Sequence, residues 1–235
     1  MTVKIRFAVA LTGFGLCLFA SFFLFRETWA AIDRAVFFFF NVRLVPDSLF
    51  LKLAAYTNVR AFDAVSLAAM GGLYLSYFLR QDSAGKRLMI CLGLSMLLVG
   101  IIIKQLGDCL YISHPSPTLV FENSNRLTEL TNISAKDAAR NSFPGDHGMM
   151  LMIFAAYMAR YFGRRAFFAA ACFVVIFSMP RIISGAHWFS DIYMGSLAIA
   201  CVALSWLLLT PASDILAAKL EKFLPSRVFP PGPGV

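Results

Sequence analysis

Residues 88–103 read LMICLGLSMLLVGIII, a run without a single Lys, Arg, Asp or Glu. A helix needs about 20 mostly apolar residues to cross the roughly 30 Å of a bilayer core, and flanking Lys or Arg can extend a shorter run by snorkelling. Five similar uncharged runs occupy residues 7–25, 64–79, 147–159, 166–180 and 192–213. The sequence therefore predicts an all-α membrane protein with six transmembrane helices in a bundle.

The composition of the chain agrees with this fold class. Of the 235 residues, 59% are hydrophobic and 14% are charged, with a mean hydropathy of +0.72. A soluble domain carries roughly 25% charged residues, so a soluble globular protein is excluded. We expect residues 1–224 to form one membrane-embedded domain, followed by a disordered tail at residues 225–235, which are rich in Pro and Gly.

The net charge of +8 comes from basic residues that are scattered singly between apolar runs. This pattern favours loop charges and phosphorylated substrates over nucleic acid. The two sets of loops hold similar numbers of Lys and Arg, but one set is about half as long and is therefore predicted to be cytoplasmic. Both termini then lie in the cytoplasm. Residues 26–63, 104–146 and 181–191 face the other side, which is the periplasm for a bacterial inner membrane.

Four consecutive phenylalanines, at residues 37–40, lie between Arg34 and Arg43. This run is too short to span a membrane and too apolar to lie in water. We therefore expect one or two interfacial helices between residues 30 and 56.

Three histidines, His114, His147 and His187, are the only ones in the chain, and each falls in or next to an outer segment. Ionisable residues at membrane depth are costly and usually mark a functional site. An isolated histidine of this kind could simply be a loop residue. Three at one level predict an active site at the outer face.

The segment PRIISGAHWFSD at residues 180–191 carries the strongest chemical pattern. His187 and Asp191 are four residues apart, so on a helix they share one face. The Asp can then hold one ring nitrogen and leave the other free as a nucleophile. Arg181 supplies a forked set of donors suited to phosphate oxygens. The alternative is an ordinary helix start with a surface histidine.

The segment SFPGDH at residues 142–147 leads directly into an apolar run. A tight turn before a helix presents backbone N–H groups that bind anions, which makes Ser142, Gly145 and Asp146 candidate phosphate-binding residues. His147 is positioned to protonate a leaving oxygen. The alternative is a plain junction between a loop and a helix.

These residues resemble the three-part signature of the type 2 phosphatidic acid phosphatase superfamily. The signature is carried by S-F-P-x-x-H at residues 142–147, by Arg181, by G-x-H ending at His187, by Asp191, and by Lys104 at the end of an apolar run. The strings TNVRAFD, SPTL, SFPGDHGMML and GAHWFSDI are similar to a phosphotransferase branch of that superfamily that acts on lipid A. The resemblance covers about residues 57–213.

The resemblance implies a membrane enzyme with a periplasmic active site and no cofactor. Undecaprenyl diphosphate would be the donor and the 1-phosphate of lipid A the acceptor. By motif position, His187 would be the nucleophile that becomes phosphohistidine and Asp191 its orienting residue. His147 would be the general acid, and Arg181 and Lys104 would bind phosphate.

The chain departs from the superfamily pattern at two places. Where the hydrolases usually carry P-S-G-H, this chain has Pro-Gly-Asp-His at residues 144–147, and His114-Pro115 replaces the Arg-Pro of the first motif. A carboxylate at Asp146 would repel phosphate unless a cation offsets it, and we expect Lys136 or Arg140 to do so. Four outer-loop residues are candidates for substrate binding: His114, Arg126, Lys136 and Arg140.

Three other functions remain open from the residues alone. A lipid phosphate phosphatase would use water as the acceptor. A metal-dependent hydrolase would need a ligand spacing such as H-E-x-x-H, which the chain lacks, so no metal site is predicted. A transporter would place its polar residues at mid-membrane rather than at one face.

Overall fold

The computed structural model describes residues 2–109 and 112–224, and the tail expected at residues 225–235 lies outside the described residues. The described part contains helices and no strands. The helices are α1 (Val3–Leu24), α2 (Arg26–Asn41), α3 (Leu49–Tyr56), α4 (Arg60–Phe78), α5 (Ser83–Asp108), α6 (Pro117–Val120), α7 (Leu127–Thr131), α8 (Asp146–Ile183), the π-helix η1 (Asp191–Ser196), α9 (Leu197–Leu209) and α10 (Ala212–Glu221).

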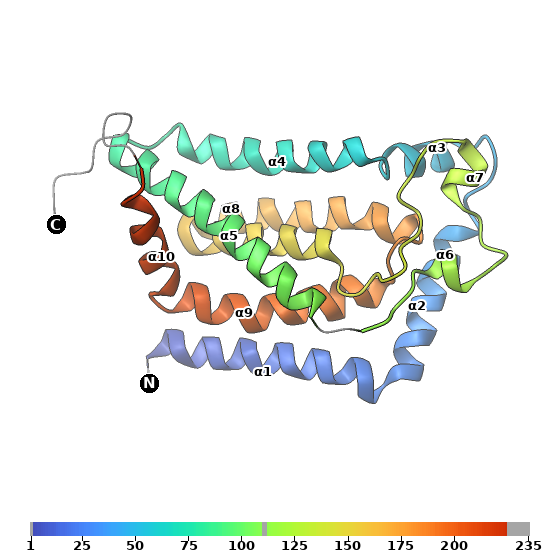
Figure 1. The fold of residues 1–235 in the computed structure, drawn as a ribbon, viewed down its shortest axis with the longest axis horizontal. Helices are drawn as coiled ribbons and strands as arrows, with labels where there is room; N and C mark the ends of the chain where they lie inside the picture. The colour runs from blue at the N-terminus through green and yellow to red at the C-terminus, as the bar shows by residue number, and fades with distance from the viewer. Residues whose placement is uncertain (1, 110–111, 225–235) are drawn as a thin grey trace.

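Five helical segments in the described residues are long and apolar enough to cross a membrane: α1, α4, α5, α8 and the continuous η1–α9 segment. Figure 1 shows them gathered into one bundle, with α1 alongside α9. A Cβ added at Gly15 of α1 would lie 2.8 Å from the backbone oxygen of Ala198 in α9. The small residue lets the two backbones approach closely, as is common between membrane helices. The protein is therefore an all-helical, multi-pass membrane protein.

Helix α8 has 38 residues but is not straight, because Gly163 has φ +83° and ψ −172°. A straight helix of this length would span about 57 Å. Yet the N–H of Gly145, just before α8, donates to the carbonyl of Asp191, just after its end, at 3.2 Å. The chain therefore reverses at Gly163, and the apolar runs at residues 147–159 and 166–180 form the two arms of a hairpin.

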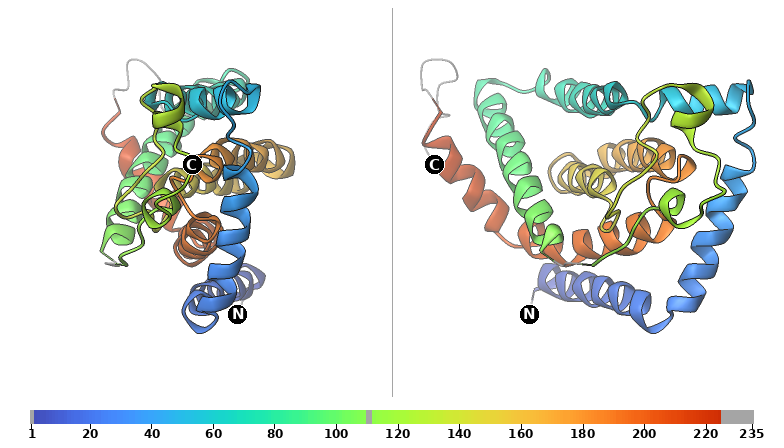
Figure 2. Two further views of the ribbon diagram at one scale, coloured as in Figure 1. Left: turned by 90° about the vertical axis from the view of Figure 1, so that its right-hand side faces the viewer. Right: turned by 45° about the vertical axis from the view of Figure 1, so that its right-hand side comes forward.

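Helices α2, α3, α6 and α7 lie together at one end of the bundle (Figure 1). Figure 2 shows α2 running from the end of α1 across the end of the bundle toward α3. Phe37 of α2 is 2% exposed and stacks on Phe121 with ring centroids 5.5 Å apart, whereas Phe39 is 55% exposed. The residues around the phenylalanine run thus form two helices, α2 and α3, as the sequence predicts.

Candidate active site

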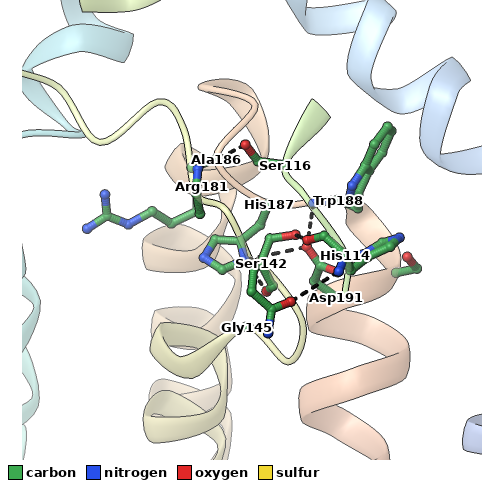
Figure 3. A network of polar contacts seen from close by, with 12 residues as sticks. His114, Ser116, Ser142, Gly145, Arg181, Ala186, His187, Trp188 and Asp191 are labelled. Carbon is green, nitrogen blue, oxygen red and sulfur yellow. Dashed lines mark hydrogen bonds and ion pairs between the residues drawn. The ribbon is translucent and has the colours of Figure 1, made fainter. Parts of the chain in front are cut away.

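The three histidines converge at the end of the bundle where α8 both begins and ends. His147 lies in the first turn of α8, His187 in the turn between α8 and η1, and His114 in the segment between α5 and α6. Figure 3 shows His114 and His187 on either side of Asp191, the first residue of η1. The hairpin of α8 is what brings residues about forty positions apart to one place.

Asp191 is the buried anion at the centre of this cluster, with a side chain 0% exposed. Its Oδ1 lies 2.8 Å from Nδ1 of His114, and its Oδ2 accepts the backbone N–H of Trp188 at 2.8 Å. Nδ1 of His187 is 3.5 Å from Oδ2. Two donors other than His187 therefore fix the plane of the carboxylate.

His187 is oriented mainly by a backbone carbonyl. Its Nδ1 lies 2.8 Å from the carbonyl oxygen of Ser142, which can only accept a hydrogen bond. Nδ1 thus carries the proton, and the lone pair of Nε2 is free to attack. The sequence suggested Asp191 as the group that orients His187. In the structure, Nδ1 of His187 lies closer to the Ser142 carbonyl, at 2.8 Å, than to Asp191, at 3.5 Å.

Arg181, in the last turn of α8, belongs to a second group of charges beside His147. Its guanidinium, on a side chain 6% exposed, pairs with Asp63 of α4, which also pairs with Lys136 of the outer loop. Nδ1 of His147 lies 3.9 Å from Oδ1 of Asp63. Asn58 accepts a hydrogen bond from Arg181 at 3.4 Å. This geometry sets two cations and a histidine next to the segment that carries His187.

Comparison with known proteins shows the family of this chain. A model of the PAP2 superfamily matches residues 84–214, which is more than half of the chain. The chain belongs to the PAP2 superfamily. It is 47% identical over 216 residues to lipid A 1-diphosphate synthase of Escherichia coli (strain K12), and the match covers 91% of each protein. A crystal structure of a transmembrane PAP2-type phosphatidylglycerolphosphate phosphatase from Bacillus subtilis matches with a TM-score of 0.45 and 17% identity, over 93% of this chain and 98% of that one.

One turn in this PAP2 chain depends on a glycine. Gly185 has φ +71°, and a Cβ there would lie 2.7 Å from the ring of Phe37. The backbone N–H groups of Ala186 and His187 both donate to the carbonyl of Arg181 at 3.1 Å. The turn therefore joins Arg181 and His187 at a fixed separation, which explains the spacing of this motif.

The turn at residues 142–147 packs more tightly than the sequence suggested. A Cβ added at Gly145 would lie 3.0 Å from Ile192 and 3.3 Å from the hydroxyl of Ser196, which donates to the Gly145 carbonyl at 2.7 Å. The Ser142 hydroxyl donates to the carbonyl of His114 at 2.7 Å. Gly145 therefore has a packing role against η1, and Ser142 is part of the scaffold beneath His187.

Asp146 and Lys104 form an ion pair at 3.2 Å. Lys104 also contacts Asp108, one turn further along α5, at 2.7 Å. We expected Lys136 or Arg140 to offset the charge of Asp146, and this expectation was wrong in the described structure. Lys136 forms its ion pair with Asp63 instead. Lys104 neutralises Asp146, because the end of α5 lies beside the start of α8.

Of the remaining outer-loop candidates, Arg126 lies in ion pairs and Arg140 lies at the surface. Arg126 is held by Glu129 at 3.2 Å and by Asp137, which is 3% exposed, at 3.1 Å. Asp137 also accepts the N–H of Thr128 at 2.9 Å, so this pair ties the loop together. Arg140 is exposed. The described residues contain no group of three or more His, Cys, Asp or Glu that could hold a metal ion.

Asp63 is the site residue that sequence reasoning missed. It stands one residue before the apolar run at residues 64–79, within the string TNVRAFD. An acidic residue at the outer end of a predicted span is the one signal that marked it, because ionisable groups at membrane depth are rarely idle. Its contacts with Arg181 and Lys136 bridge segments 118 and 73 positions away.

Proposed function

We propose that this protein transfers the terminal phosphoryl group of undecaprenyl diphosphate to the 1-phosphate of lipid A through a phosphohistidine at His187. The products are lipid A 1-diphosphate and undecaprenyl phosphate. The identity of 47% with the E. coli synthase supports the substrates and reaction class. The observation that carries the mechanism is the 2.8 Å contact between Nδ1 of His187 and the Ser142 carbonyl, which leaves Nε2 as the reactive atom.

In the first half-reaction, Nε2 of His187 attacks the terminal phosphorus of the donor. An N–P bond forms, the P–O bond of the anhydride breaks, and undecaprenyl phosphate leaves. His147 donates a proton to the departing oxygen. Arg181 and Lys136 meet the charge that spreads over the oxygens of the transferring group, as phosphoryl transfer requires.

In the second half-reaction, an oxygen of the lipid A 1-phosphate attacks the phosphorus of the phosphohistidine. The N–P bond breaks, the electron pair returns to Nε2, and His147 takes back its proton from the acceptor phosphate. One phosphoanhydride replaces another, so the exchange is nearly balanced in energy. It needs neither a nucleotide nor a cofactor.

The proposed location is the inner membrane, with the site on the periplasmic side. The two arms of α8 each serve as one span, which gives six spans with α1, α4, α5 and η1–α9. An even number of spans puts both termini on one side, and the higher density of Lys and Arg in the shorter set of loops favours the cytoplasm for that side. The outer segments then carry all three histidines to the compartment where mature lipid A is exposed to the donor.

The test follows the terminal phosphate of undecaprenyl diphosphate, labelled with ³²P, in purified enzyme with and without lipid A. We expect label on lipid A, and on the protein as an acid-labile adduct when lipid A is omitted. Release of free phosphate at the same rate in both conditions would instead establish a phosphatase.

His187→Ala is the decisive variant for the covalent route. We expect it to lose both the protein-bound label and the transfer, by a factor of about 10⁴ or more. Asp146→Asn is a suitable comparison variant, because it removes a charge at the start of α8 and leaves the His187 side chain in place. Normal transfer by His187→Ala would exclude the phosphohistidine.

A further inference from the structure

His114 contacts both groups that face Nδ1 of the nucleophile. Its own Nδ1 lies 2.8 Å from Oδ1 of Asp191. Its backbone carbonyl accepts the N–H of Ser142 at 2.8 Å and the Ser142 hydroxyl at 2.7 Å. Asp191 and the Ser142 carbonyl are the two acceptors beside His187, so one residue holds both of them (Figure 3).

The side-chain contact satisfies an oxygen of Asp191 that has no other hydrogen-bond donor among the residues that the structure describes. Asp191 is fully buried, and a buried carboxylate must be met by hydrogen-bond donors. Trp188 donates to Oδ2, and His114 is the donor at Oδ1. Loss of the His114 donor would free the carboxylate to rotate and approach Nδ1 of His187, which lies 3.5 Å from Oδ2 and is the next N–H beyond that of Trp188 at 2.8 Å.

The ring of His114 is itself fixed by its surroundings. Its centroid lies 5.6 Å from that of Phe22, 6.2 Å from that of Phe143 and 5.8 Å from that of Trp188. The next residue, Pro115, accepts the indole N–H of Trp188 at 2.8 Å. A side chain enclosed in this way, with 24% of it exposed, is built into the nucleophilic segment and is not a free loop residue.

We propose that His114 is a positioning residue for His187. By donating Nδ1–H to Oδ1 of Asp191, it fixes the carboxylate with Oδ2 3.5 Å from Nδ1 of His187, so that His187 keeps its shorter hydrogen bond to the Ser142 carbonyl and its Nε2 stays aimed at the donor phosphorus. This inference rests on the proposed phosphohistidine mechanism. It gives His114 a role different from contact with the substrate phosphate.

Two variants separate the hydrogen bond from the packing. His114→Phe keeps an aromatic ring among Phe22, Phe143 and Trp188 but removes the donor. His114→Asn loses the ring but places an amide N–H close to the former Nδ1 position. Both keep the backbone carbonyl that Ser142 uses. The measurement is the rate of protein phosphorylation by labelled undecaprenyl diphosphate alone, together with KM for donor and for lipid A.

We expect His114→Phe to slow phosphorylation about 100-fold, the effect of a small misplacement of a reacting group, with KM for the donor changed less than about threefold. His114→Asn should recover the rate to within about tenfold of the parent protein. Equal phosphorylation rates in the parent and in His114→Phe would overturn the proposal. So would a raised KM for lipid A in both variants with normal phosphorylation, because that pattern belongs to a phosphate ligand.

The result stays interpretable when one variant is unstable. Asn is smaller than His and keeps the donor, so a folded His114→Asn that phosphorylates 100-fold more slowly at unchanged KM contradicts the proposal by itself. The parent protein tests the proposed function separately. If the parent never acquires label on His187, the covalent mechanism fails, whereas failure of the His114 proposal leaves that label intact.

Discussion

Asp63 shows at the scale of one residue how the site keeps two cations together. Arg181 is almost fully buried, Lys136 is partly exposed, and both contact the carboxylate of Asp63. Two neighbouring cations repel each other unless an anion lies between them. A buried guanidinium also needs hydrogen-bond acceptors to offset its lost hydration. Asp63, in the first turn of α4, is both the anion between the two cations and a hydrogen-bond acceptor for Arg181. Asn58 is a further acceptor for Arg181.

We therefore expect Asp63→Asn to lower kcat/KM for transfer roughly 10-fold to 100-fold, because Arg181 and Lys136 lose the anion that sets their separation. Glu129→Gln is the matched control. It removes the same charge from the same outer part of the chain, but from an exposed pair with Arg126, and should change kcat/KM less than twofold. Steady-state kinetics with labelled donor compares the two, and equal effects would show that Asp63 acts only through overall charge.

At the scale of the element, a buried carboxylate of α2 contacts the residue that precedes η1. Asp33 is 4% exposed; it accepts the backbone N–H of Ser190 at 2.8 Å and the Ser190 hydroxyl at 2.5 Å. Burial raises the pKa of Asp33 above its ordinary value, and the hydrogen bonds from Ser190 offset only part of this effect. Ser190 immediately precedes Asp191, so α2 supports the start of η1.

The raised pKa has a predictable effect on stability. The folded state binds the Asp33 proton more tightly than the unfolded state, so this group's contribution to stability is fully present below the unfolded pKa and is lost as the pH rises through the folded pKa. Asp33→Asn keeps the shape and both contacts with Ser190 without the charge. We expect the melting temperature to fall less between pH 4 and pH 8 in Asp33→Asn than in the parent protein, as measured by thermal unfolding in detergent. If the melting temperatures of the two proteins change in parallel with pH, the raised pKa of Asp33 is contradicted.

The helices were more predictable from the sequence than the contacts between them. Each apolar run appears as a helix or as one arm of α8, because a chain in a bilayer must satisfy its backbone hydrogen bonds within the segment. The structure brings His147, Arg181 and His187, which the motifs at residues 142–147 and 180–191 singled out, to the same end of the bundle. The pairing of Asp63 with Arg181 and of Asp146 with Lys104 depends on how α4 and α5 pack against α8, and no local pattern encodes that.

At the scale of the whole molecule, the two ends of the bundle carry different kinds of ion pair. The end with the histidines holds the charges of the active site. The opposite end is closed by α10, where Arg87 of α5 pairs with Glu221 at 2.9 Å and Arg160 of α8 pairs with Asp214 at 3.1 Å. These basic residues border the short loops, and the proposed orientation places them on the cytoplasmic side. Helix α5 has 26 residues and spans about 39 Å from one end to the other, which is enough to cross the bilayer core.

The orientation of the bundle can be tested with one cysteine at each end. In a background with all five native cysteines replaced, Ser134→Cys lies in the exposed outer loop and Ser83→Cys at the exposed start of α5. We expect an impermeant maleimide to label Ser134→Cys in intact spheroplasts and to label Ser83→Cys only after permeabilisation, because the bilayer separates the two positions. Both variants should keep transfer activity, since neither residue contacts the site. Labelling of Ser83→Cys alone in intact spheroplasts would place the histidines in the cytoplasm, on the opposite side from that proposed for the lipid A acceptor.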